Sequence, residues 1–207
     1  MYHQIFAFLT TAVILTLTPG PDNMMVLSIS LSKGRRYGSI FGAGCALGCL
    51  SHTLMAMAGI SALIVTSSHA LTFLKLFGGV YLLYFGLKLI LNKNTGGSYG
   101  STFSDHLSMR EMFFQGFLAS SINPKVALFF LSFLPQFVVP DEGNIAVQLG
   151  ILGSFFMFQA IIIFSLIAYF SGSIANFLNH HFKMGGWLDR VAGCIFMLLA
   201  MRMWVNV

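Results

Sequence analysis

The sequence predicts an all-α membrane protein of six transmembrane helices, built as two inverted three-helix repeats whose first helix is broken by proline. Three observations predict this fold. Of the 207 residues, 57% are hydrophobic and only 8% are charged, whereas soluble domains carry about 25% charged residues. The chain also contains six apolar stretches of membrane-spanning length, and its two halves share a pattern of prolines and glycines. Most of the surface is therefore expected to face lipid.

A transmembrane helix needs about 20 mostly apolar residues. Between the third and fourth apolar stretches, residues 93–111 are rich in Gly and Ser and indicate a flexible linker. We therefore expect a first repeat at 1–92, a linker at 93–111 and a second repeat at 112–207. The six predicted spans lie at about 4–31, 38–66, 70–91, 112–139, 146–172 and 187–206.

Lysine and arginine in short loops collect on the cytoplasmic side of a membrane. The first, third and fifth connecting loops hold or adjoin most of the basic residues, whereas the opposite side has only Lys75 and Arg202. Both termini are therefore expected outside, with the linker in the cytoplasm. The basic residues form no dense stripe, so no nucleic-acid partner is expected. The loop residues are Lys33, Arg35, Arg36, Lys88, Lys93, Arg110, Lys183 and Arg190.

The two halves of the sequence resemble each other. Gly79 and Gly193 lie in similar apolar stretches at matching distances from the flanking charges, and the first span of each half contains a proline. Three spans is an odd number, so the second copy has to be inverted in the membrane. Matching interrupted helices in inverted repeats indicate a transporter site. The alternative is that unrelated membrane helices resemble each other in composition.

Prolines interrupt the first and fourth spans. Proline removes a backbone donor and clashes with the carbonyl four residues earlier, so Pro19 is expected to free the carbonyl of Leu15. A new half-helix would then begin with Gly20 as its N-cap and Pro21 at its first position. In the fourth span, Pro124 is expected to free the carbonyl of Ser120, with Asn123 as the N-cap.

Two opposite charges follow these breaks. Asp22 suits the positive end of its half-helix, whereas Lys125 opposes it, and a charge at membrane depth is a functional hypothesis. In one interpretation the two form a structural ion pair. In the other they bind a zwitterion, with Asp22 on the ammonium and Lys125 and the half-helix amides on the carboxylate. Asp22 is also the first candidate for a coupling proton. The predicted substrate-binding residues are Asp22, Asn23, Asn123 and Lys125.

Other polar side chains in the spans are weaker candidates. His52, Tyr81 and Gln159 could line the cavity or could form hydrogen bonds between helices. Cys45, Cys49 and His52 share one helix face, but three ligands on one helix rarely converge on one ion, so we expect packing and no metal. The chain has no nucleophile elbow, phosphate loop or metalloprotease motif. An enzyme is therefore not expected.

Residues 17–23, Leu-Thr-Pro-Gly-Pro-Asp-Asn, resemble the Pro-Gly-Pro signature of the LysE/RhtB-type amino-acid exporters. Residues 123–137 are similar to the second signature of that family, and residues 81–88 to its third span. The resemblance implies secondary export of amino acids or their derivatives across the bacterial inner membrane, driven by protons and without a cofactor. The residues of this chain that match the signature positions of the family are Pro19, Gly20, Pro21, Asn123, Pro124 and Lys125.

We therefore expect an exporter that works by alternating access around a midplane site, with an amino acid, protons and the lipid bilayer as partners. A neutral amino acid such as threonine, homoserine or leucine is favoured over lysine or arginine, since only one acidic group is available. The alternatives are a passive channel for small polar solutes, a membrane oxidoreductase and a scaffold. The small-residue faces formed by Gly38, Gly42, Gly44 and Gly48 would permit a homodimer.

Overall fold

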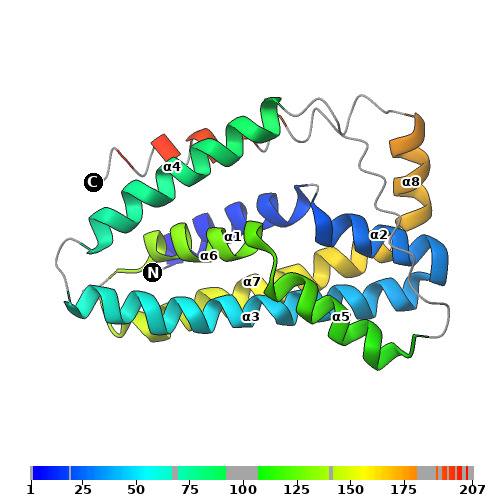
Figure 1. Cartoon of the computed structure of the whole chain (residues 1–207), viewed down its shortest axis with the longest axis horizontal. Coiled ribbons are helices and arrows are strands. Elements are labelled where there is room, and N and C mark those ends of the chain that lie inside the picture. Colours follow the sequence, from blue (N-terminus) through cyan, green and yellow to red (C-terminus); the bar gives the residue numbers. More distant parts are fainter. Residues whose placement is uncertain are drawn as a thin grey trace.

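A computed structural model describes residues 2–18, 20–66, 70–91, 107–139 and 142–180, together with scattered positions between 190 and 204. Every regular element in this described part of the chain is a helix (Figure 1). The predictions for Pro19, for most of the 93–111 linker and for much of the sixth span fall outside the described residues. The helices are α1 (Tyr2–Leu17), α2 (Pro21–Lys33), α3 (Arg35–Thr66), α4 (Ala70–Leu91), α5 (Met109–Ser121), α6 (Pro124–Ser132), the 3₁₀ helix η1 (Leu134–Phe137), α7 (Ile145–Tyr169) and α8 (Ser171–His180).

The first and fourth spans are broken where the sequence predicts. The axis turns by 55° between α1 and α2, and by 52° between α5 and the segment that begins with α6. Gly20 is the extended N-cap of α2 and Pro21 occupies its first turn. Asn123 caps α6, and its side chain accepts a hydrogen bond of 3.0 Å from the backbone N–H of Lys125. Local proline and capping chemistry therefore accounts for both breaks.

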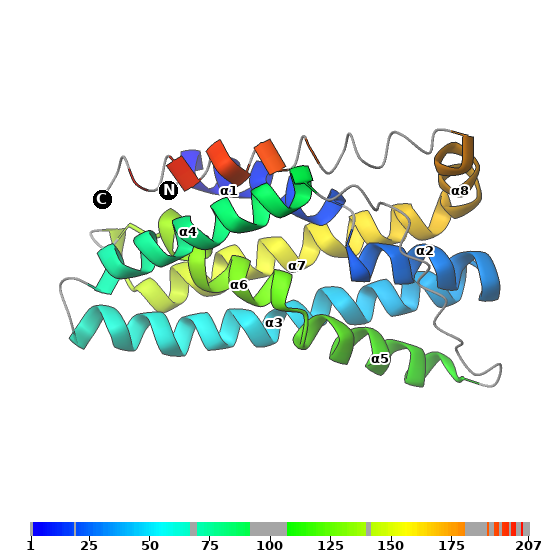
Figure 2. The same cartoon turned by 45° about the horizontal axis from the view of Figure 1, so that its top comes forward.

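The long helices α3 and α7 lie side by side along the molecule and run in opposite directions (Figures 1 and 2). Close packing on α3 depends on its glycines. A Cβ atom at Gly44 would lie 2.1 Å from the carbonyl oxygen of Phe113 in α5, and one at Gly42 would lie 2.6 Å from Cβ of Phe164 in α7. The predicted small-residue face thus packs helices of the same chain against one another.

Aromatic rings fill the space between α1, α6, η1 and α7. Phe129 stacks at centroid distances of 4.9 Å on Phe133 and 5.7 Å on Phe156. Phe8 from α1 meets Phe137 of η1 edge to face at 5.4 Å. Phe8, Phe129 and Phe133 are at most 2% exposed, so this cluster fixes the half-helix α6 against α1 and α7.

Two helices of the described chain, within α3 and α7, are long and apolar enough to cross a membrane. Counting each bent pair as one span gives up to four, so the described residues are consistent with a membrane protein and the count of six stays a prediction. The fifth span was predicted at about 146–172, and α7 covers Ile145–Tyr169. α7 ends at Tyr169, and after Phe170 the separate helix α8 begins.

The two broken helix pairs run in opposite directions (Figures 1 and 2). The pair α1 and α2 runs from one end of the molecule to the other, whereas α5 and α6 run back (Figures 1 and 2). The start of α1 lies at one end of the molecule, and the α2–α3 junction and the start of α5 lie at the other (Figure 1). Lys33, Arg35, Arg36 and Arg110 belong to this second end. The basic residues of these connections therefore gather at one end, as the orientation argument expects.

Candidate functional site

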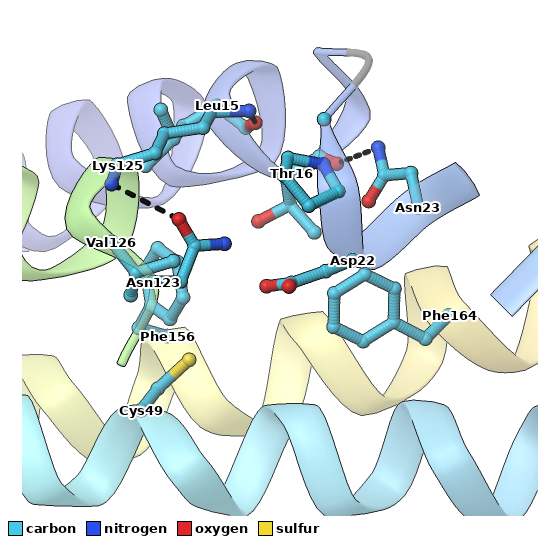
Figure 3. A pocket seen from close by; sticks show the side chains of 12 residues that line it. Leu15, Thr16, Asp22, Asn23, Cys49, Asn123, Lys125, Val126, Phe156 and Phe164 are labelled. Atoms are coloured by element: carbon cyan, nitrogen blue, oxygen red, sulfur yellow. Dashed lines mark hydrogen bonds between the residues drawn. The ribbon is translucent and has the colours of Figure 1, made fainter. Parts of the chain in front are cut away.

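A small buried cavity lies where the two helix breaks meet (Figure 3). Its volume, counted as the space open to the centre of a water-sized sphere, is about 30 Å³, which is room for about two water molecules. All four predicted substrate-binding residues line it. Among the described residues, the lining is Leu15, Thr16, Gly20, Pro21, Asp22, Asn23, Cys49, Asn123, Lys125, Val126, Phe156 and Phe164.

Lys125 crosses from α6 to the end of α1. Its ammonium donates hydrogen bonds of 3.2 Å to the carbonyl oxygen of Leu15 and 3.0 Å to that of Thr18. The Leu15 carbonyl is the one that Pro19 was expected to free. Gly20 leaves room for this path, because a Cβ atom there would lie 3.2 Å from Nζ of Lys125.

The direction of the Lys125 side chain changes the sequence-based expectation about its charge. Its backbone is in the first turn of α6, where a cation is unfavourable, but its ammonium lies at the carboxyl end of α1. The partial negative charge of a helix C-terminus attracts a cation. The charge of Lys125 therefore stabilises the break in the first span.

Asn23 stabilises the same break from the other side. Its side-chain amide donates hydrogen bonds of 2.7 Å to the carbonyl oxygen of Thr16 and 3.1 Å to that of Thr18. Carbonyls at the end of a helix have no partner within the helix. Asn23 and Lys125 together supply donors to these carbonyls.

Asp22 is 7% exposed, and its carboxylate points across the cavity toward the side-chain amide of Asn123 (Figure 3). It interacts with the side chains of Asn123 and Ser120 and with the positive charge of Lys125. The oxygen of the Asn123 amide is occupied by its cap bond to α6, so the NH₂ group is the part left to face Asp22. The two opposite charges thus belong to one cavity.

His52 stabilises the break in the fourth span. Its Nε2 lies 3.0 Å from the carbonyl oxygen of Ser120, the group that Pro124 was expected to free, and the N–H of Asn123 donates to the same oxygen at 3.0 Å. The Sγ of Cys49 lies 3.5 Å from Oγ of Ser120. Cys49 and His52, which lie on one face of α3, are therefore connected to the helix break by hydrogen bonds.

Three predicted cavity-lining residues are absent from this lining. Gln159 donates a hydrogen bond of 2.9 Å to Oγ1 of Thr16, which lines the cavity. His52 contacts the backbone carbonyl of Ser120, a residue outside this lining. The Oε1 atom of Gln159 is buried and has no hydrogen-bond partner among the described residues. Tyr81 lies in α4, which contributes no residue to this lining.

Several lining residues escaped the sequence analysis. Thr16 carries a weak signal, since it precedes the proline pair and its hydroxyl could have been expected near freed carbonyls. Phe156 and Phe164 of α7 carry none, because nothing distinguishes them from other phenylalanines in an apolar span. With Leu15 and Val126 they form an apolar wall beside the charged groups.

The backbone adds a second source of positive potential. Both α2 and α6 begin at the cavity, and the N-cap of α2 is a glycine without a side-chain hydrogen bond. The first amides of α2 therefore keep their capacity to donate, and a helix N-terminus of this kind binds anions. The cavity combines a carboxylate, an ammonium and a helix N-terminus without a side-chain cap, which suits a small molecule that carries both charges.

Comparisons with known proteins agree with a transporter. The family model described as LysE type translocator matches residues 13–206. The chain is 30% identical over 174 residues to the membrane protein YrhP of Bacillus subtilis, covering 81% of this chain and 82% of that protein. It is 25% identical over 204 residues to a leucine efflux protein of Enterobacter, covering 97% of this chain and 94% of that protein. A leucine efflux protein of Salmonella typhimurium is 24% identical over 198 residues, covering 96% and 93% respectively. No solved structure matches the chain.

Proposed function

The chain belongs to the LysE type translocator family, and from this premise we propose that it exports small neutral amino acids by alternating access at the cavity between its two broken helices. One observation carries the proposal. Asp22, Lys125 and the amino ends of α2 and α6 come together around one buried cavity. A translocator of zwitterions needs this combination of charges in one place.

Each end of an amino acid would find a complementary group. The substrate ammonium would bind the Asp22 carboxylate, and the substrate carboxylate would bind the Lys125 ammonium and the free amides of α2. The hydrogen bonds from Lys125 to Leu15 and Thr18 would then compete with substrate. A carboxylate in the cavity would therefore weaken the connection between α6 and α1.

The lining favours a neutral, apolar side chain. Phe156, Phe164 and Val126 would pack against it, while Asp22 is the only acidic residue among the described residues of the lining. A lysine or arginine substrate would bring a second cation that lacks a carboxylate partner. The leucine efflux relatives support the same choice, and leucine is the substrate that we would test first.

Transport requires the cavity to change size. A volume of about 30 Å³ does not hold an amino acid, so substrate binding has to separate the half-helices around it. The two breaks, at which the axis turns by 55° and 52°, are the natural hinges. The opposite directions of α1–α2 and α5–α6 support an inverted repeat, in which opening toward one side closes the other. Asp22 would release its proton as substrate arrives, which would couple export to inward proton movement.

The proposal also places the protein in the bacterial inner membrane with both termini outside. The basic residues at the α2–α3 junction and at the start of α5 support a cytoplasmic location for that end. Substrate would then enter from the end that carries Arg35, Arg36 and Arg110, and leave at the end where the chain begins.

The test is leucine efflux from proteoliposomes loaded with labelled leucine, measured with and without an imposed pH gradient. Wild type is compared with Asp22→Asn, which keeps the shape and removes the charge, and with Glu142→Gln, which makes the same change at an exposed turn before α7. We expect gradient-stimulated efflux in wild type and Glu142→Gln, and loss of both efflux and stimulation in Asp22→Asn.

Three results would count against parts of the proposal. Unchanged efflux in Asp22→Asn would leave that residue a structural partner of Lys125. Flux that only follows the leucine gradient and never responds to pH would favour the passive channel. Absence of flux for a broad panel of amino acids, from protein shown to be inserted and folded, would overturn export itself.

A further inference from the structure

A second hollow lies away from the substrate cavity, between the start of α3 and the last turns of α7, which lie side by side in both views (Figures 1 and 2). We call it the α3–α7 groove. Its volume is about 590 Å³ on the same measure that gives about 30 Å³ for the substrate cavity. The two share no lining residue. The groove therefore has room for a ligand larger than an amino acid.

One end of the groove is strongly positive. Arg35 and Arg36 are the first two residues of α3 and both are exposed. The guanidinium of Arg35 lies 4.8 Å above the ring centre of Tyr169, a contact that holds it in place and leaves its N–H edge available. The first intrahelical bonds to Gly34 come from the N–H groups of Tyr37 and Gly38, so the two arginine amides precede them and add positive potential.

The other end of the groove is apolar. Ile162 and Leu166 line it and are 60% and 50% exposed. They belong to a stripe of exposed apolar residues that follows α7 at helical spacing, as expected for a face that meets acyl chains. Ile161, Ser39 and Ser165 also line the groove. The stripe consists of Val147, Ile151, Phe155, Phe158, Ile162, Leu166 and Tyr169.

We propose that the α3–α7 groove binds one anionic phospholipid of the cytoplasmic leaflet. Its phosphate would lie at Arg35 and Arg36, where two guanidinium groups match phosphate geometry. Its acyl chain would follow Ile162 and Leu166 along α7. Charge complementarity selects an anionic headgroup over a zwitterionic one, and the apolar wall selects a lipid over a free phosphate. The positive-inside orientation brings this end to the leaflet surface that carries anionic lipid.

The experiment counts bound lipid on the full-length chain by native mass spectrometry in detergent. The probes are phosphatidylglycerol, phosphatidylcholine of the same acyl composition, and glycerol 3-phosphate, which has the anion without the chains. Variants are Arg35→Gln, the double variant Arg35→Gln/Arg36→Gln, and Ile162→Trp, which fills the apolar end and keeps both arginines. The matched control is Arg110→Gln, because Arg110 is also exposed and stacks on an aromatic ring, that of Phe114, outside the groove.

Each arginine near an anionic lipid contributes enough to change affinity by about fivefold, so the double variant should bind phosphatidylglycerol about thirtyfold more weakly. Ile162→Trp should also weaken binding, whereas Arg110→Gln should bind as wild type does. Phosphatidylcholine and glycerol 3-phosphate should bind poorly to every form.

Equal binding of both phospholipids to wild type, or equal loss of phosphatidylglycerol binding in Arg110→Gln and the double variant, would overturn the proposal. If the double variant does not fold, unchanged binding in Ile162→Trp and in Arg35→Gln would overturn it as well. This experiment measures bound lipid and not leucine export. The proposed lipid site and the proposed export function can therefore be refuted independently.

Discussion

Replacing Lys125 by methionine removes the ammonium group but keeps a side chain of nearly the same length. The change deletes the hydrogen bonds of 3.2 Å and 3.0 Å to the carbonyls of Leu15 and Thr18 and the positive charge that faces Asp22. If Lys125 only stabilises the helix break, stability and transport should fall together. If it binds the substrate carboxylate, transport should fall much further than stability.

The structure allows both effects to be estimated. Two hydrogen bonds from a charged donor contribute about 1.5–3 kcal/mol each, but methionine also avoids the cost of desolvating an ammonium, which is several kcal/mol. These terms oppose each other, so the free energy of unfolding should decrease by less than about 3 kcal/mol. Loss of one charged hydrogen bond to the substrate carboxylate corresponds to about a 10- to 150-fold weaker interaction.

Leucine efflux from proteoliposomes is measured beside the midpoint of thermal unfolding in the same detergent. Lys88→Met is the matched control, since Lys88 is exposed near the end of α4. We expect Lys125→Met to lose at least about tenfold in efflux rate at subsaturating leucine with a modest shift in the unfolding midpoint. Efflux within about twofold of wild type, at unchanged stability, would refute the assignment of Lys125 to substrate binding.

Three further predictions concern stability, each measured as the unfolding midpoint in detergent. Gly44→Ala should destabilise the protein by about 1–3 kcal/mol or more, because a Cβ atom there would lie 2.1 Å from a carbonyl oxygen of α5. Gly59→Ala should leave the stability unchanged, because nothing lies within 4 Å of its Cβ position. Equal destabilisation by Gly44→Ala and Gly59→Ala would contradict the close packing of α3 on α5. His52→Ala should cost about 0.5–1.5 kcal/mol, because it removes the ring nitrogen 3.0 Å from the Ser120 carbonyl while the N–H of Asn123 still donates to that carbonyl. His52→Gln should recover part of the loss, and full stability in His52→Ala would show that the carbonyl needs no second partner. Asn144→Ala should cost about 0.5–2 kcal/mol of stability, because the Asn144 side chain caps α7 by accepting from two backbone N–H groups. Asn144→Asp should keep most of this stability. Equal loss of stability in both variants would contradict a capping role.

Several features of the site could be predicted because they depend on residues that are close in sequence. A proline lacks the N–H group and has a fixed φ angle whatever surrounds it, so the starts of α2 at Pro21 and of α6 at Pro124 follow from the residues alone. The same holds for Asn123 as an N-cap, because its side chain reaches an amide only two residues away. The less apolar run Ser171-Gly172-Ser173 follows the end of α7 at Tyr169, but such a run can end a helix or lie within it, so the sequence alone did not show that a separate helix, α8, begins there.

The sequence by itself determined that this is an apolar helical protein with two proline breaks, an opposite charge just after each break and basic residues in particular loops. The tertiary structure decided which groups satisfy the carbonyls at those breaks. The Lys125 ammonium lies at the end of α1 and His52 lies at the end of α5, across separations of 110 and 68 residues. Donors for a freed carbonyl are chosen by proximity in space, and in a packed helical bundle that proximity depends on how all the helices cross. For the same reason, only the structure showed that the charge of Lys125, unfavourable at the start of its own helix, is placed at the negative end of another.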